Sequence, residues 1–113
     1  MENQLQILQS YLKRLRGVSG GRPLQHLVCR DGFTMSVQVG DGLYCTPRNS
    51  VGPWSAVEIG YPSQVEPLLW PYAELPGRWT DTVYPYTPIE VAAAVCELHG
   101  GIDEVAMTEY VSV

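Results

Sequence analysis

Apolar residues in the first part of the chain recur at the spacing of one helix face. Over residues 3–16, Ile7 and Tyr11 broaden a stripe of leucines that stand three or four positions apart: Leu5, Leu8, Leu12 and Leu15. Gly17 and the glycines after it interrupt the pattern. The pattern therefore predicts an amphipathic helix of about four turns, joined to the rest by a glycine-rich linker. Because the stripe is too apolar to remain in water, the helix packs either on its own chain or on another subunit, and we expect a homo-oligomer.

The next part of the chain carries the two-residue alternation of β-strands. Residues 24–29 and 33–39 are joined by Arg30-Asp31-Gly32-Phe33, and an Asp-Gly pair is typical of a hairpin turn. A short third strand is predicted over 43–45 and a fourth over 54–59. Short turns between successive strands predict an antiparallel meander. Its polar face, with Thr34, Ser36 and Gln38, is either solvated or lines a cleft in a dimer.

The second half of the chain predicts one strong helix among shorter pieces. Prolines punctuate 61–80, where Ser63 could cap one or two helical turns, and 81–86 is a short extended segment. Thr87-Pro88-Ile89-Glu90 combines an N-cap residue, proline at the first helical position and glutamate at the third, and predicts a helix over 88–99. The β-prone tail is expected to add an edge strand or to fray.

These elements predict a single α+β domain over 1–113. We expect an antiparallel sheet of four or five strands packed by helix 88–99, with a separate N-terminal amphipathic helix. Within the domain, 1–17 holds the N-terminal helix, 18–22 the linker, 23–102 the α+β core and 103–113 the tail.

The composition is typical of a globular chain, and the charge limits the kinds of partner that it can bind. Apolar residues make up 45% of the 113 residues, charged residues 17%, and the net charge is −5. This net charge disfavours direct nucleic-acid binding. The first thirty residues sum to +4 and the remainder to −9, and this uneven distribution suggests self-complementary contacts between subunits or a partner that recognises one sign. The cations near residue 16 are equally explained by the helix dipole. No apolar run approaches the roughly 20 residues of a membrane span, and no signal peptide is expected.

The cysteines and histidines show no metal-site or catalytic spacing. Cys29, Cys45 and Cys96 contain no C-x-x-C pair, so we expect free, buried thiols in a reducing compartment; a Cys29–Cys45 disulfide requires that their strands be neighbours. Cys45 with His26 or His99 could form a nucleophile and base, but a solvated helix end is the simpler role for His99. We therefore predict no catalytic residue, no metal and no cofactor.

The candidate ligand-binding residues gather around the segment Tyr44-Cys45-Thr46-Pro47-Arg48-Asn49. Arg48 follows a predicted strand end, where its planar guanidinium could bind a phosphate or carboxylate in bidentate fashion. We assign ligand binding to Arg48, Tyr44, Asn49, Arg30 and Trp54. The alternative is structural: Arg48 pairs with Glu58 or Asp31 across the meander.

Several short motifs between residues 29 and 102 resemble a family of small proteins encoded in tailed-bacteriophage genomes. These motifs are Cys29-Arg-Asp-Gly32, Met35-Ser-Val-Gln38, Tyr44-Cys-Thr-Pro-Arg48, Val57-Glu-Ile-Gly60, Pro71-Tyr-Ala-Glu74, Val83-Tyr84, Pro88-Ile-Glu-Val91 and His99-Gly-Gly-Ile102. The resemblance brings no functional residue with it. It implies an accessory phage protein in the host cell cytoplasm, of a class that often acts against host defence by stoichiometric binding.

Within that context, the leading hypothesis is capture of a small phosphorylated, nucleotide-type immune signal by Arg48, Arg30 and nearby aromatic residues. The alternatives are an inhibitor that binds a host defence protein through its acidic surface, or a small virion or assembly component. The acidic surface after residue 30 favours the inhibitor, whereas the aromatic and arginine-bearing loop favours the captured ligand.

Overall fold

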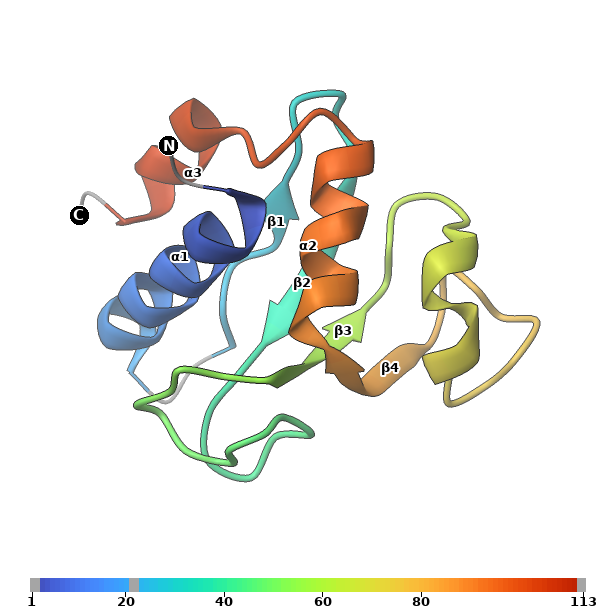
Figure 1. Cartoon of the computed structure of the whole chain (residues 1–113), viewed down its shortest axis with the longest axis horizontal. Coiled ribbons are helices and arrows are strands. Elements are labelled where there is room, and N and C mark those ends of the chain that lie inside the picture. Colours follow the sequence, from blue (N-terminus) through green and yellow to red (C-terminus); the bar gives the residue numbers. More distant parts are fainter. Residues whose placement is uncertain (1–2, 21–22, 112–113) are drawn as a thin grey trace.

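The computed structural model describes residues 3–20 and 23–111 and confirms the α+β class (Figure 1). Four antiparallel strands lie in the order β1-β2-β3-β4, α2 packs on the sheet, and α1 packs against α2 and α3. In chain order, the elements are α1 (Gln4–Ser19), β1 (Leu27–Val28), β2 (Thr34–Gln38), β3 (Ala56–Gly60), η1 (Pro67–Tyr72), β4 (Val83–Pro88), α2 (Ile89–Leu98) and α3 (Glu104–Val111).

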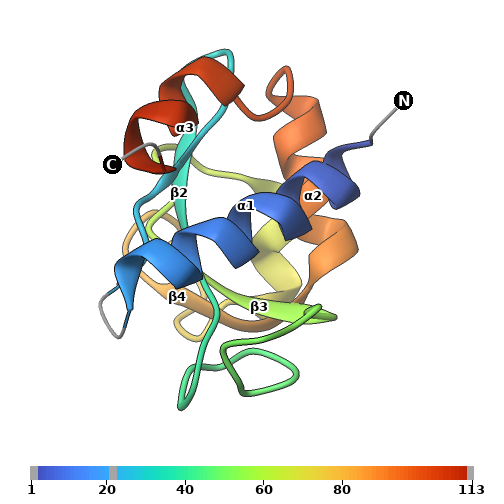
Figure 2. The same ribbon diagram turned by 90° about the vertical axis from the view of Figure 1, so that its left-hand side faces the viewer.

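The predicted N-terminal amphipathic helix is present as α1, and its apolar face packs into the core. Asn3 caps it in a capping box with Gln6, and the leucines Leu8, Leu12 and Leu15 are at most 1% exposed. Figure 2 shows α1 crossing in front of α2. Because its stripe is covered within one chain, the stripe no longer argues for a homo-oligomer. The helix also runs to Ser19, so the predicted linker over 18–22 begins later than expected, and residues 21–22 lie outside the described part.

Strand register separates the two faces of the sheet. Val37 pairs with Ile59 on the face that α2 covers, and both side chains are fully or almost fully buried. The next pairs along, Ser36 with Gly60 and Gln38 with Glu58, lie on the opposite face. The opposite face of the sheet is therefore built from small and polar residues.

The predicted third strand over 43–45 is wrong, although the hairpin turn at Asp31-Gly32 is confirmed. Residues 39–55 form a long loop that is linked to β3 by an isolated bridge between Thr46 and Ala56 and by the amide of Tyr44, which donates to Glu58. Gly40 and Gly42 adopt positive φ angles of 147° and 78°, which break the extended backbone that a strand needs. The meander therefore has four strands, and the loop is free to form one wall of a site.

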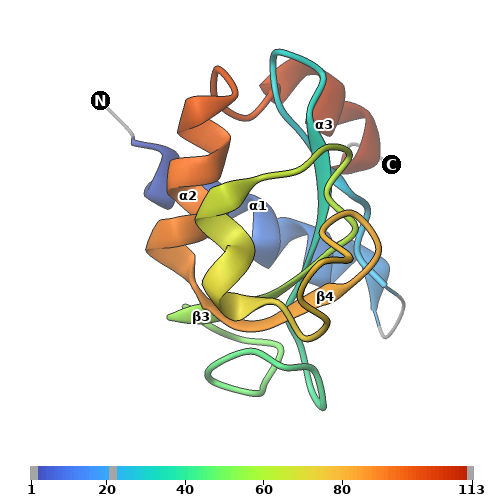
Figure 3. The same cartoon turned by 90° about the vertical axis from the view of Figure 1, so that its right-hand side faces the viewer.

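The two predicted caps in the second half are also wrong. Thr87 lies fully buried in β4 and its hydroxyl donates to the carbonyl of Tyr84, so α2 begins after Pro88 without a side-chain cap. Ser63 does not cap a helical turn, because its hydroxyl accepts from the amide of Thr34; Glu66 caps η1 instead. Figure 3 shows η1 beside α2.

The tail forms helix α3 where an edge strand or a frayed end was expected. Asp103 accepts a hydrogen bond from the amide of Ala106 at the start of this helix, and Met107 is fully buried. Contacts with α1 and β1 hold the helix in place. An N-terminal cap and one buried anchor outweigh the weak strand preference of the tail. In the described part of the chain, no helix has the length and apolar character needed to cross a membrane.

Candidate functional site

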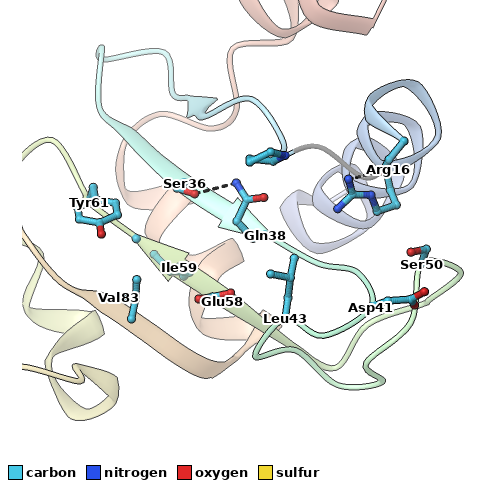
Figure 4. A pocket seen from close by; sticks show the side chains of 13 residues that line it. Arg16, Ser36, Gln38, Asp41, Leu43, Ser50, Glu58, Ile59, Tyr61 and Val83 are labelled. Carbon is cyan, nitrogen blue, oxygen red and sulfur yellow. Dashed lines mark hydrogen bonds between the residues drawn. The ribbon is translucent and has the colours of Figure 1, made fainter.

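A groove of about 410 Å³ hollows the face of the sheet opposite α2 (Figure 4). Its floor is a row of three cross-strand neighbours, Ser36 on β2, Gly60 on β3 and Val83 on β4. A Cβ atom added at Gly60 would lie 3.6 Å from the Cγ1 of Val83 and 3.8 Å from the Cβ of Ser36, which is ordinary contact. The missing side chain at Gly60 therefore contributes directly to the depth of this open-face groove.

The walls of the open-face groove come from segments that are distant in the sequence. Tyr61 lies at one end, directly after β3, and Arg16, Asp41 and Ser50 lie at the other (Figure 4). Leu43, from the loop between β2 and β3, adds an apolar contact surface. The groove thus offers a flat ring and an aliphatic side chain beside polar groups, a combination typical of small-ligand sites.

Gln38 and Ser36 on the floor are tied to each other and to the chain. The Oε1 of Gln38 accepts from the amide of Leu24 at 2.8 Å, and its Nε2 donates to the carbonyl of Leu24 at 3.0 Å and to the hydroxyl of Ser36 at 2.8 Å. Ser36 is only 8% exposed. This part of the polar face of β2 is therefore not simply solvated, because Ser36 and Gln38 are held by hydrogen bonds within the chain and line the groove.

Glu58 is the half-buried carboxylate of the groove and has few partners. The amide of Tyr44 donates to its Oε2 at 3.5 Å, a long hydrogen bond. Within the part of the chain that the structure describes, no cation lies within 4.0 Å of this carboxylate; the ion pairs there use Asp31, Glu66, Asp81 and Glu104. The carboxylate of Glu58 thus faces the groove without a cation from the residues that the structure describes.

Arg16 closes the groove at the end of α1. The residue is 7% exposed, its Nη1 donates to the carbonyl of Val39 at 2.7 Å, and its Nη2 donates to the carbonyl of Gly20 at 2.5 Å. From the sequence, the cations near residue 16 are related to the helix dipole or to a partner, and not to the core. Its position four residues after Leu12, on the buried stripe, is the signal that could have placed it inside the protein.

Four of the five predicted site residues do lie in one loop, but they stabilise that loop. Arg48 is exposed, and its Nε and Nη2 donate to the carbonyls of Leu43 at 3.0 Å and Gly42 at 2.9 Å. Its guanidinium carbon stands 5.8 Å from the ring centre of Tyr44. The alternative ion pair of Arg48 with Glu58 or Asp31 is wrong, because the guanidinium turns back onto its own loop.

Asn49 and Trp54 complete this loop, whereas Arg30 lies elsewhere. The side-chain oxygen of Asn49 accepts from the amides of Val51 and Gly52, both at 3.0 Å. The backbone carbonyl of Asn49 accepts from the buried indole nitrogen of Trp54 at 3.0 Å. Arg30 lies in the turn between β1 and β2 and donates to the carbonyl of Gly100. Figure 1 shows this turn at the opposite end of β2 from the loop over 39–55. Arg30 and Arg48 therefore do not converge on one ligand.

A second polar cluster surrounds His99 at the end of α2. The Nδ1 of His99 lies 2.6 Å from Asp31, its Nε2 lies 3.0 Å from Glu66, and its ring stacks on Phe33 with centres 4.0 Å apart. Burial by itself would lower the pKa of His99, but the hydrogen bonds to the two carboxylates raise it overall. The predicted solvated helix end is wrong, since His99 is only 8% exposed. We call these four residues the His99 cluster.

The Asp31 carboxylate of this cluster is stabilised in its charged form. The amide of Phe33 donates to it, as does the His99 ring, and together these bonds lower the pKa of Asp31.

Among the described residues, no group of three or more His, Cys, Asp or Glu side chains could hold a metal ion.

All three cysteines are free and buried, as predicted. The thiol of Cys96 is hydrogen-bonded to Cys29, which lowers the pKa of Cys29 and raises that of Cys96. Cys45 donates instead to the carbonyls of Gly40 and Pro47. The pairing of Cys45 with a histidine base is therefore not formed, since both ring nitrogens of His99 face carboxylates and His26 is exposed.

Comparison of the chain with protein-family models, with curated proteins and with solved structures gives no match. The resemblance to the phage family therefore stays a prediction, and the functional argument depends on the geometry of the open-face groove.

Proposed function

We propose that this chain is a binding protein that captures a small ligand stoichiometrically in the open-face groove. The observation that carries the proposal is the row Ser36, Gly60 and Val83, which leaves about 410 Å³ of space over the centre of a sheet whose other face is packed by α2. A sheet held rigid on one face is a preformed platform, so a ligand on the other face loses little affinity to ordering of the protein.

Capture is favoured over catalysis by the side chains that line the groove. Among the described residues, the ionisable groups that line it are Arg16, Asp41, Glu58 and Tyr61, and the guanidinium of Arg16 already donates to two carbonyls. Nucleophilic catalysis needs a nucleophile within hydrogen-bond reach of a base. Cys45 has only carbonyl acceptors, and His99 is held between carboxylates outside the groove.

The geometry of the groove gives little support to the ligand predicted from the sequence, a phosphorylated immune signal. A phosphate would meet the carboxylates of Glu58 and Asp41 in the groove, whereas the donors of Arg48 point to its own loop. A counter-defence role in the host cytoplasm is compatible with capture of other ligands and remains part of the proposal. Docking of the acidic surface on a host protein remains the alternative.

Amide chemical shifts of the ¹⁵N-labelled protein test the proposal with four probes of one scaffold: benzyl alcohol, benzylamine, benzoate and phenyl phosphate. We expect at least one probe to shift the amides of Ser36, Gly60 and Tyr61 in a saturable way. Gly60→Leu, which fills the floor, should abolish these shifts. Gly17→Leu is the matched control, because a Cβ at Gly17 meets nothing within 4 Å.

Two results would overturn the proposal. One is the absence of saturable shifts in the groove for all four probes, and the other is equal probe binding by the wild type and a folded Gly60→Leu variant. Thermal unfolding of each variant shows that it is folded, and Gly60→Ala provides a smaller block if the leucine does not fit.

A further inference from the structure

We infer that the open-face groove selects ligands that carry a cationic nitrogen, an ammonium or amidinium group, which pairs with Glu58. This inference rests on the proposed binding function and adds the chemical class of the ligand. It starts from the place of Glu58 on β3, where its carboxylate lies between the floor of the groove and Leu43 (Figure 4).

The cross-strand neighbour of Glu58 does not neutralise it. Gln38 pairs with Glu58 in the register of β2 and β3, but the amide nitrogen of Gln38 is engaged by the carbonyl of Leu24 and the hydroxyl of Ser36. The amide of Tyr44, at 3.5 Å, supplies only a weak bond to one oxygen. The carboxylate therefore keeps acceptor capacity that faces the groove.

Glu58 differs in this respect from the other carboxylates whose surroundings the structure describes. Those that are buried or half-buried are used: Glu66 binds His99, and Asp103 caps the first turn of α3. The carboxylates without a cation, such as those of Glu90 and Glu97, belong to exposed residues in water. Glu58 is half-buried, and its one described partner is the long bond from the amide of Tyr44.

A half-buried carboxylate with only one weak hydrogen bond is costly, and a ligand cation would reduce that cost by forming a charge-assisted hydrogen bond. Asp41 at the end of the groove adds a second negative charge. Arg16 stands at the wall with both Nη atoms on backbone carbonyls, so the groups that meet a ligand in the middle of the groove are Glu58, Leu43 and the floor. Leu43 and the ring of Tyr61 suit the apolar part of such a ligand.

The experiment compares benzylamine, benzamidine, benzyl alcohol and benzoate on one ¹⁵N-labelled protein. We expect the two cations to bind about tenfold more tightly than benzyl alcohol, as one charged hydrogen bond allows, and benzoate to bind more weakly still. Glu58→Gln keeps the shape but removes the charge, so the tenfold preference should disappear while benzyl alcohol binds as before. Glu97→Gln is the control, an exposed carboxylate on α2 that should leave the preference intact.

The outcomes separate this inference from the binding function. If benzyl alcohol or benzoate binds as tightly as benzylamine, or if Glu58→Gln retains the cation preference, the groove binds ligands but Glu58 does not select them. If no probe binds in the groove, the proposed function falls as well. Raised salt should weaken benzylamine binding and leave benzyl alcohol binding unchanged; equal weakening of both would also contradict the ion pair.

Discussion

The His99 cluster and the open-face groove use their charged groups in opposite ways. In the His99 cluster both ring nitrogens face carboxylates, at 2.6 Å and 3.0 Å, and the ring stacks on Phe33. In the groove the carboxylate of Glu58 has one long bond of 3.5 Å from a backbone amide. We therefore expect the cluster that its own chain completes to stabilise the fold, and the proposed ligand to use the acceptor capacity that Glu58 retains.

The two regions also differ in what they connect. The His99 cluster joins three segments: the turn after β1, the residue before η1 and the end of α2. The floor of the groove lies within one sheet and would remain if its polar groups were changed. Changes at His99 should therefore reduce stability, and changes at Gly60 or Glu58 should alter binding in a folded protein.

The largest expected effect follows from removal of the imidazole. His99→Ala should lower the free energy of unfolding by about 3 kcal/mol or more, because the Glu66 side chain, 5% exposed, would remain buried without its cation. Urea denaturation at pH 6 measures the change. His26→Ala, at an exposed position, should stay within about 0.5 kcal/mol of the wild type. A loss below 1 kcal/mol for His99→Ala would remove the structural role assigned to the cluster.

The second effect is a dependence of stability on pH. Because folding raises the pKa of His99 above 6.5, its contribution is fully present below pH 6.5 and is lost as the pH rises through the folded value. Folding lowers the pKa of Asp31 below 3.8, so its contribution is present above pH 3.8 and is lost as the pH falls through its folded value. The cluster should therefore stabilise the protein most between pH 3.8 and pH 6.5.

Free energies of unfolding measured from pH 3 to pH 9 check this dependence. The wild type should lose stability above pH 6.5, and the difference between the wild type and His99→Gln, whose side chain does not titrate, should shrink over the same range. A difference that stays constant with pH would show that His99 is not protonated in the folded protein.

A smaller effect distinguishes the groove from the cluster. Gly60→Ala should raise the free energy of unfolding by about 0.4–1 kcal/mol, since the added methyl group finds ordinary contacts and the unfolded chain loses freedom. The same methyl group should weaken benzylamine binding. Gly100→Ala is the contrasting change. Gly100 has a φ angle of +87°, which strains any residue with a side chain, so this variant should have a lower free energy of unfolding than the wild type. A destabilised Gly60→Ala would mean that the floor is packed more tightly than its distances indicate.

The smallest effect is expected at Arg48. Arg48→Ala removes two exposed hydrogen bonds within one loop, so the free energy of unfolding should fall by only about 0.5 kcal/mol. Benzylamine binding should be unchanged. Thermal unfolding and the amide shift titration measure both. Loss of binding in a stable Arg48→Ala variant would return the ligand site to the loop and argue against the groove.

Much of the fold could be predicted from the sequence, but little of the site could. The stripe over 3–16 and the alternation over 33–39 appear as α1 and β2 in the structure. The sequence predicts a ligand site in the loop around Arg48, but the hydrogen bonds of the Arg48 side chain run to the backbone of its own loop. From the sequence, Glu58 is only a possible partner for Arg48. The position of a single carboxylate in a strand does not indicate whether a cation lies near it in the folded protein.

By itself, the sequence determined the elements whose signals are local: the α1 stripe, the β2 alternation, the Asp31-Gly32 turn and the body of α2. Helical period, strand period and turn chemistry depend on residues only a few positions apart. Only the tertiary structure decided which polar groups meet. Strand register places Ser36 beside Gly60, and helix packing brings His99 to carboxylates 68 and 33 positions away. These contacts depend on how distant segments pair and pack, and the spacing of residues within one segment carries no information about that.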